Sequence, residues 1–245
     1  MNYKLLLQYD GTKLNGWQKQ GNTDNTIQGK LEAILEKMYG EPVEVHGSGR
    51  TDAGVHALGQ VANFHAPAKF SAEEIQETLN EYLSKDIRVL NVETAEERFH
   101  ARLSAKAKTY EYRIDNGPVA DVFRRKYVMR EELPLDLESM RQAAGYLIGT
   151  HDFKTFCANK KMKKSTVRTI YSIEIEDHAG LVSIKYRGNG FLYNMVRILT
   201  GTLIEVGRGI RKPEELQGIV EAQDRGAAGF TAPGQGLYLV NVEYR

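Results

Sequence analysis

The stretch HGSGRTDAGVHALGQ, residues 46–60, contains four glycines within fifteen positions. A glycine in a helix interior costs about 0.5–1 kcal/mol relative to alanine, so this stretch is predicted to be a loop. The residue patterns on either side of it predict strands over residues 43–46 and 60–65. The loop therefore joins two strands directly, with no helix between them.

The elements around this loop complete a recognisable order. Ser71 is predicted to cap one helix, Asn25 or Thr26 to cap another, and Gly40 to end that second helix, because these residue types suit helix ends. Hydrophobic periodicity predicts strands at residues 3–9, 43–46, 60–65 and 87–92 and helices at residues 27–38 and 71–83. This is the ferredoxin-like βαββαβ order.

The second half of the chain follows the same order with longer connections. The patterns predict strands at residues 109–114, 167–175, 181–186 and 237–242 and helices at residues 137–147, 191–206 and 213–222. We therefore expect an α+β protein of two tandem ferredoxin-like units with mostly antiparallel sheets. The expected domains are residues 1–105, which carry the loop, and residues 106–245, with an active-site cleft between them.

Composition limits the class of protein. Apolar residues make up 41% of the 245 residues, which is enough for a buried core. Cys157 is the only cysteine, which excludes a disulfide framework and suggests a reducing compartment. The apolar part of the N-terminus is too short for a secretory signal, and no segment approaches 18 apolar residues. We expect a soluble, cytoplasmic protein.

The net charge of +1 conceals an uneven distribution. Residues 1–97 hold 9 basic and 15 acidic side chains, whereas residues 98–212 hold 22 basic and 12 acidic ones. Residues 213–245 hold 2 basic and 5 acidic side chains. A basic middle between acidic flanks is typical of a surface that binds a polyanion, although a solvated basic face would give the same counts.

Common cofactor and nucleophile patterns are missing from the sequence. The loop lacks both the third glycine of a dinucleotide fingerprint and the Gly-Lys-Ser/Thr of a P-loop. The six histidines include no pair at i, i+4, and there is no second cysteine, so we expect no metal site. On these grounds alone, Asp52 needs no role beyond forming an Asx turn or capping a helix.

Residues 98–113, which include Tyr110 and Tyr112, are a mixture rich in aromatic and basic residues. Such a mixture suits unpaired RNA, because cations hold the backbone while aromatic rings stack on bases. The alternative is a strand whose tyrosines pack inward. A denser cluster of cations on an expected loop, at a place that a polyanion could reach, consists of Lys160, Lys161, Lys163 and Lys164.

Arg197 lies in a segment, residues 191–199, that is apolar nearly all round a helix and should be largely buried. A buried arginine needs an anionic partner, because an unpaired buried charge is very costly. Alternatively, its stem packs while its head reaches water.

Taken together, these segments resemble the tRNA pseudouridine synthase A family over nearly the whole chain. The most specific match is Gly49-Arg50-Thr51-Asp52-Ala53-Gly54-Val55-His56-Ala57. The other matches, in chain order, are YDGT (9–12), GWQ (16–18), FHAR (99–102), HDF (151–153), FLYNMVR (191–197) and QGLYL (235–239). Leu14 and Gly234 depart from residues that many members carry, an aromatic and a second proline.

The resemblance implies an isomerase without a cofactor that converts uridine to pseudouridine at nucleotides 38, 39 and 40 of the tRNA anticodon arm. It implies a homodimer that binds tRNA, with Asp52 as the nucleophile and Arg197 as its basic partner. Tyr110 would contact the flipped uracil and Arg50 would assist flipping. The remaining expected substrate-binding residues are Gln60, Phe99, His100, Ala101, Arg102, Leu103 and the four lysines at 160, 161, 163 and 164.

Physical chemistry is consistent with those roles. Desolvation raises the pKa of a carboxyl group, whereas a cation within about 4–6 Å lowers it by about 1–3 units, so Arg197 would keep Asp52 ionised. Tyr110 offers a ring face for stacking. Two other functions use the same residues: a non-catalytic RNA-binding protein, which needs neither Asp52 nor a buried Arg197, and a nucleoside hydrolase, which would release free uracil.

Overall fold

The computed structural model describes residues 1–159 and 161–244, and these form two compact units. The first unit comprises Met1–Lys106 together with the end of the chain from Tyr238, and the second comprises Ala107–Leu237. Both are α+β, with mostly antiparallel strand pairs. Within the described residues, no helix is long and apolar enough to cross a membrane.

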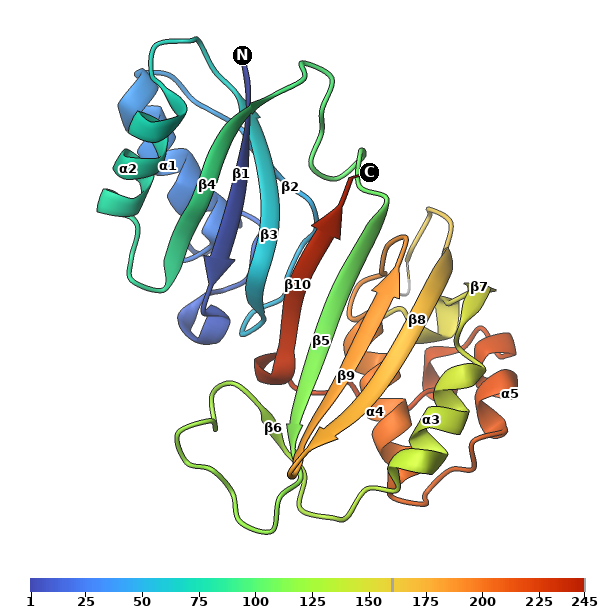
Figure 1. Ribbon diagram of the computed structural model, residues 1–245. Coiled ribbons are helices and arrows are strands. Elements are labelled where there is room, and N and C mark those ends of the chain that lie inside the picture. The colour runs from blue at the N-terminus through green and yellow to red at the C-terminus, as the bar shows by residue number, and fades with distance from the viewer. Residues whose placement is uncertain (160, 245) are drawn as a thin grey trace. The chain divides into compact units, whose positions relative to one another are not determined.

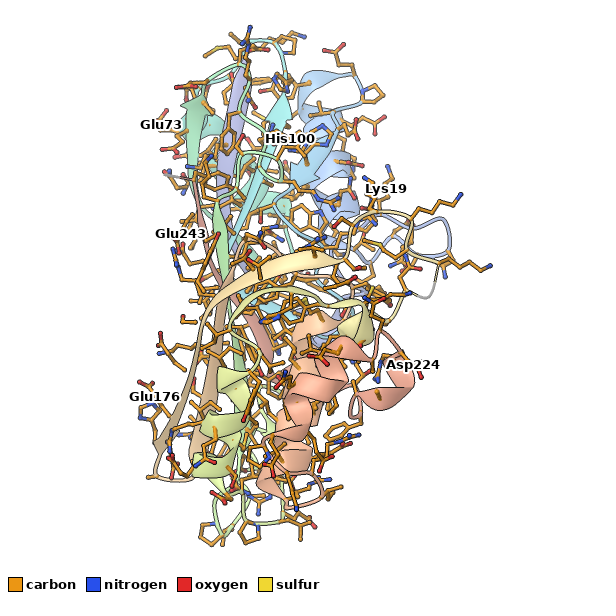
Figure 2. All side chains as sticks on the ribbon, turned by 90° about the vertical axis from the view of Figure 1, so that its right-hand side faces the viewer. Lys19, Glu73, His100, Glu176, Asp224 and Glu243 are labelled. Carbon is orange, nitrogen blue, oxygen red and sulfur yellow. The ribbon has the colours of Figure 1, made fainter. Side chains whose placement is uncertain are left out.

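The first unit has the βαββαβ order expected for it (Figure 1). Its elements are β1 (Asn2–Tyr9), α1 (Ile27–Tyr39), β2 (Val45–Gly47), β3 (His56–His65), α2 (Ala72–Tyr82) and β4 (Ile87–Ala95). β1 pairs antiparallel with both β3 and β4, and β2 pairs antiparallel with the second half of β3. α1 and α2 lie on the same face of these strands (Figures 1 and 2).

Sequence signals at the helix ends are confirmed. The Thr26 side chain accepts a hydrogen bond from the Gly29 N–H, and Gly40 ends α1 in the left-handed conformation. Ser71 and Glu74 form a capping box at the start of α2. The alternating residues of β1 bury Tyr3, Leu5 and Leu7 in the core of the first unit.

The second unit contains the expected strand–helix–hairpin–helix series with two additional short strands. Its elements are β5 (Ala107–Asp115), β6 (Met129–Arg130), α3 (Leu137–Gly145), β7 (Gly149–Asp152), β8 (Val167–His178), β9 (Leu181–Gly188), α4 (Met195–Gly207) and α5 (Glu215–Glu221). β9 pairs antiparallel with both β5 and β8, β7 pairs with β8, and β6 pairs in parallel with β5. Short 3₁₀ turns occupy Gly11–Lys13, Lys154–Phe156, Arg225–Ala227 and Gly234–Gly236.

Two further details of the second half differ from the sequence prediction. α4 begins at Met195 rather than near residue 191, because Asn194 adopts the left-handed conformation with φ of 58° and interrupts the helix there. The last strand, β10 (Leu237–Glu243), was expected to complete the second half. Its residues Tyr238 and Leu239 also pair in parallel with β3, and the chain from Tyr238 onward is grouped with the first unit.

Candidate active site

Residues 48–55 of the glycine-rich stretch form the loop between β2 and β3 in the first unit, whereas residues 56–59, also predicted to be loop, begin β3. The Ser48 N–H donates to the Val61 carbonyl at 2.7 Å, and the Val55 N–H donates to the Asp52 carbonyl at 3.2 Å. Between these two backbone bonds, the Arg50 side chain is exposed and Asp52 is half-buried. The loop thus presents a cation and a carboxylate two residues apart on a backbone held at both ends.

Buried polar side chains hold this loop from beneath. Gln60 is fully buried and donates from Nε2 to the Gly49 carbonyl at 3.0 Å and to the Tyr9 hydroxyl at 3.3 Å. The Tyr9 hydroxyl lies 2.8 Å from Thr51 Oγ1, and Ser48 Oγ donates to Gln60 Oε1 at 2.6 Å. Burial raises the pKa of Tyr9 to about 12, so its phenol stays protonated at neutral pH. A neutral network therefore fixes the residues on both sides of Arg50.

The segment of residues 11–17 packs against the same loop, and its glycines make that approach possible. Gly16 has φ of 88°, and a Cβ there would lie 2.6 Å from the Thr51 carbonyl oxygen. A Cβ on Gly11 would lie 2.0 Å from the Val55 carbonyl oxygen. The neighbouring Trp17 N–H donates to the Thr51 carbonyl at 3.0 Å. The family matches at residues 9–12 and 16–18 are thus parts of the loop's support.

Leu14, one of the two departures from the family pattern, belongs to this support. Its side chain is buried, and its carbonyl accepts a hydrogen bond from the Gly54 N–H at 3.3 Å. The backbone contact does not depend on the side chain, so an aromatic residue is not needed to make it.

Residues 99–103 form a second ordered segment in the first unit, held by two buried asparagines. Asn2 Nδ2 donates to the Phe99 carbonyl at 2.8 Å, and the Ala101 N–H donates to Asn63 Oδ1 at 2.8 Å. Phe99 packs against Tyr244 with ring centroids 5.0 Å apart. Arg102 and Leu103 follow and are exposed.

His100 connects this segment to the start of the Asp52 loop. Its ring stacks on that of His46 at a centroid distance of 4.9 Å, and Figure 2 shows His100 in the first unit. Burial lowers the pKa of His100, and repulsion from His46 and Arg102 lowers it further, whereas Glu44 opposes the shift. His100 is therefore favoured in its neutral form.

Tyr110 and Arg197 belong to the second unit. Tyr110 lies on β5 opposite Tyr186 of β9, is 7% exposed, and packs edge to face against Phe191 at 5.2 Å. Arg197 lies in the first turn of α4 and is half-buried. Its Nε donates to the Ala232 carbonyl at 2.7 Å and its Nη1 donates to Asn194 Oδ1 at 3.0 Å.

The positive charge of Arg197 affects the pKa of Tyr112, which lies in the same unit. Burial raises the pKa of Tyr112 above its ordinary value, and the charge of Arg197 opposes that rise. Tyr112 donates its hydroxyl proton to the Pro233 carbonyl at 2.7 Å. Asp52 and Arg197 lie in different units, and their pairing stays a prediction.

The aromatic and basic stretch of residues 98–113 is partly a strand with inward tyrosines. Tyr110 and Tyr112 are both buried on β5, and Arg113 Nη2 pairs with Glu111 Oε2 at 2.8 Å. Its first part, residues 98–103, has exposed side chains next to the half-buried rings of Phe99 and His100, and Lys106 is also exposed.

The lysine cluster follows the 3₁₀ turn at Lys154–Phe156. Lys161, Lys163 and Lys164 are exposed, whereas Lys160 lies outside the described residues. The segment is joined to the start of α4 through the Ala158 N–H, which donates to the Tyr193 carbonyl at 3.1 Å. Among the described residues, no three His, Cys, Asp or Glu side chains come together as a metal site would require.

Comparison with known proteins decides the family. A family model described as tRNA pseudouridine synthase matches residues 6–103 and 143–245. The tRNA pseudouridine synthase A 2 of Bacillus anthracis is 49% identical over 243 residues, 99% of each chain. The chain belongs to the tRNA pseudouridine synthase A family. It is therefore an isomerase that modifies tRNA.

Other members of the synthase family are similarly related. The tRNA pseudouridine synthase A of Bacillus sp. (strain KSM-64) is 49% identical over 243 residues, and that of Thermoanaerobacter sp. (strain X514) is 46% identical over 243 residues; each alignment covers 99% of both chains. A chain described as "Crystal Structure of a Cbf5-Nop10-Gar1 Complex" aligns with a TM-score of 0.37 and 13% identity. That alignment covers 80% of this chain and 46% of the other.

Sequence reasoning missed two residues that position the synthase's expected site. Tyr9 and Asn194 fall within matched family segments, but sequence reasoning gave neither a role in the site. Tyr9 supports the Asp52 loop, and Asn194 bonds Arg197. A tyrosine on the buried face of a strand gives no local sign of what its hydroxyl contacts. Asn194 carried a weak signal, because asparagine tolerates the left-handed conformation better than most residues.

Proposed function

We propose that this synthase converts uridine to pseudouridine at nucleotides 38, 39 and 40 of the tRNA anticodon stem-loop, with Asp52 as the nucleophile. The observation that carries the proposal is the full-length similarity to tRNA pseudouridine synthase A proteins, together with a loop that presents Asp52 on a braced backbone. The loop matches the family signature residue by residue over residues 49–57.

In the proposed reaction the Asp52 carboxylate forms a bond to C1′ of the ribose or to C6 of the base. The N1–C1′ bond breaks, the uracil turns within the site, and C5 bonds to C1′. The bond between the Asp52 carboxylate and the attacked carbon breaks, which frees the carboxylate again. The proton on C5 then leaves and N1 gains a proton, so that the released product is an isomer of the substrate. The reaction needs an ionised carboxylate at the start, because a protonated one is a poor nucleophile.

Arg197 is proposed to keep that carboxylate charged. A guanidinium close to Asp52 lowers the pKa of the carboxyl group and offsets the desolvation that a bound base imposes. Two contacts support a fixed head group: Nε is held by the Ala232 carbonyl and Nη1 by Asn194. The arginine is therefore oriented by its own unit before any substrate binds.

Tyr110 and Arg50 are proposed to handle the base. Taking a base out of its stack costs a few kcal/mol, and Arg50, exposed on the loop, could occupy the space that the base leaves. Stacking on an aromatic ring contributes about 1–3 kcal/mol per base, which suits Tyr110. With an ordinary pKa near 10, a tyrosine phenol is a poor base at neutral pH, so we assign Tyr110 to contact rather than to proton removal.

The remaining substrate contacts are proposed from exposure and charge. Contacts to tRNA phosphates and bases would come from the lysine cluster and from Phe99, His100, Arg102 and Leu103, in a homodimer whose two subunits share one tRNA. Ala101 is buried and bonded on both sides by Asn63 and Tyr244, so we assign it to holding this segment. Gln60 is buried, so we assign it to holding the Asp52 loop rather than to direct contact.

The test is incubation of the protein with an unmodified tRNA transcript, followed by mapping of pseudouridine at each nucleotide. We expect product at 38, 39 and 40 with the parent protein and none with Asp52→Asn, whose tRNA affinity stays within about threefold, or under 1 kcal/mol. Asp52→Ala is the matched control, because it has no amide that can hydrolyse back to Asp.

Three results would contradict the proposal. Turnover of the Asp52 variants at about a tenth of the parent rate, a loss of only about 1.4 kcal/mol, would remove Asp52 as the nucleophile. Free uracil would indicate a hydrolase. Binding of tRNA with no change in nucleoside content would indicate a non-catalytic RNA-binding protein.

A further inference from the structure

The loop of residues 116–128 connects β5 to β6 in the second unit (Figure 1). It carries several exposed large apolar side chains. Phe123 is 85% exposed, Val119 82% and Val122 60%, and Tyr127 is also exposed. Single exposed apolar side chains are common on protein surfaces, but several in one segment indicate a surface that contacts another molecule. Sequence reasoning did not single out this segment.

The loop is ordered by its own polar contacts. The buried Asp115 carboxylate accepts hydrogen bonds from the N–H groups of Gly117 and Asp121, both at 3.2 Å, and pairs with Arg130 Nη1 at 3.0 Å. Asp121 Oδ1 in turn accepts the Phe123 N–H at 2.9 Å. The Phe123 ring is thus displayed from a held backbone, which reduces the entropy lost when a partner binds.

Hydrogen bonds also hold the last residues of the loop, before β6. Gln235 Nε2 donates to the Arg125 carbonyl at 3.2 Å and to the Val128 carbonyl at 3.0 Å. The Tyr127 N–H donates to the Arg124 carbonyl at 2.7 Å. The backbone that carries the exposed side chains is therefore held at both ends of the loop.

Three consecutive exposed cations separate the two aromatic rings: Arg124, Arg125 and Lys126. Asp121 is the one acidic residue in the sequence from 116 to 128, and its carboxylate lies 3.1 Å from Arg124 Nε. The surface is therefore net positive with exposed rings on both sides. Cations that hold a phosphate backbone and rings that stack on bases are the combination that single-stranded or looped RNA requires.

We propose that residues 122–127 form a second tRNA-binding surface, in which Phe123 stacks on an unpaired base while the adjacent cations contact phosphates. The choice of tRNA as the partner rests on the proposed function. A second copy of this chain is the less favourable occupant, because a two-fold interface centred on the loop would bring the same three cations of each copy together. None of these residues takes part in the proposed chemistry, so the surface serves binding.

The experiment compares Phe123→Ala, Phe123→Leu and the triple variant Arg124→Gln/Arg125→Gln/Lys126→Gln with the parent protein. An unmodified tRNA transcript is the probe, and dissociation constants are measured over a series of salt concentrations. The control is Leu133→Ala, which removes an exposed apolar side chain just outside the loop. Thermal unfolding establishes that each variant is folded, and sedimentation gives its oligomeric state.

We expect both Phe123 variants to weaken tRNA binding at least fivefold, since leucine keeps the apolar character but offers no ring for stacking. The triple variant should reduce the slope of log affinity against log salt by about 0.7–0.9 for each phosphate that it no longer neutralises. kcat at saturating tRNA should stay within twofold for all of them, and Leu133→Ala should bind like the parent.

Two outcomes overturn the inference. One is tRNA affinity within twofold of the parent for the Phe123 and triple variants. The other is a change in sedimentation with Phe123→Ala that Phe123→Leu does not share, which would assign the surface to protein contact. If the parent protein makes no pseudouridine but loop variants still weaken tRNA binding, the proposed function fails and this inference stands.

Discussion

At the scale of single residues, Asn194 links backbone geometry to the proposed chemistry. It holds a left-handed conformation with φ of 58° at the start of α4, and its Oδ1 accepts a hydrogen bond from Arg197 Nη1 at 3.0 Å. A hydrogen bond to a charged group contributes about 1.5–3 kcal/mol. Asn194 is therefore a positioning residue that acts through Arg197.

Two substitutions at this position separate its roles. Asn194→Gly keeps the left-handed backbone and removes the hydrogen bond to Arg197, whereas Asn194→Ala also adds about 1–2 kcal/mol of backbone strain. We expect both to lower kcat about tenfold or more with the KM for tRNA within threefold, and only the alanine variant to lose clear stability in urea unfolding. Parent-like kcat in Asn194→Gly would show that Arg197 does not depend on this hydrogen bond.

At the scale of elements, the Asp52 loop is shaped by segments distant in sequence. Tyr9 and Gln60 bond it from the strands, and Gly16 lets residues 11–17 approach it closely. These supports keep the backbone near Asp52 fixed although the loop contains several glycines.

Gly16→Ala tests this close approach against a matched control. Gly16 and Gly40 have similar φ values of 88° and 78°, but only at Gly16 would a Cβ meet backbone atoms, the nearest at 2.6 Å. We expect Gly40→Ala to lose about 1 kcal/mol of stability with full activity. Gly16→Ala should lose more stability and at least tenfold in kcat, measured by unfolding and by pseudouridine formation. Equal effects of the two changes would mean that the close approach does not shape the site.

The His46–His100 stack gives the first unit a pH dependence. Burial and repulsion lower the pKa of His100 below its ordinary value of 6.5, so the unfolded chain binds this proton more readily than the folded one. The stabilisation is therefore complete above about pH 6.5 and is lost as pH falls towards the lower folded pKa.

The free energy of unfolding of the parent should accordingly decline between pH 7 and pH 5 more steeply than that of His100→Gln. Urea unfolding at several pH values measures both slopes. His65→Gln is a suitable control, since His65 is exposed. Identical slopes for the parent and His100→Gln would contradict the assignment.

At the scale of the whole molecule, charge is divided along the chain. The excess of cations falls between residues 98 and 212, and the exposed part of it includes the lysines at 161, 163 and 164 and the cations of the 122–127 loop. The acidic excess falls in residues 1–97. A polyanion should therefore be attracted mainly to the second unit.

Changing the lysine cluster should flatten the salt dependence of tRNA binding. With Lys160, Lys161, Lys163 and Lys164 all replaced by Gln, each phosphate that is no longer neutralised removes about 0.9 from the log–log slope for duplex RNA, or about 0.7 for single strands. Lys37→Gln/Lys85→Gln, which removes exposed cations of the acidic part, should leave the slope unchanged. A parent-like slope for the quadruple variant would identify the cluster as a solvated loop.

The amino-acid sequence by itself determined the features that depend on residues close together in the chain, namely helix ends, strand alternation and the family signature. Ser71 with Glu74, Thr26 and Gly40 define helix ends through bonds made within one turn, and the alternation of Tyr3, Leu5 and Leu7 defines a strand. The nine-residue signature around Asp52 was enough to indicate the family. These signals are local, so spacing along the chain reveals them.

Tertiary structure alone decided which distant groups meet. It paired the last strand with β3, placed Tyr9 and Gln60 beneath the Asp52 loop, and fully buried Tyr112 while exposing Phe123. A tyrosine in an alternating strand and a phenylalanine among arginines look equally able to stack on RNA in sequence. Only the packing of strands and helices fixes which rings are covered, because burial depends on segments far away in the chain.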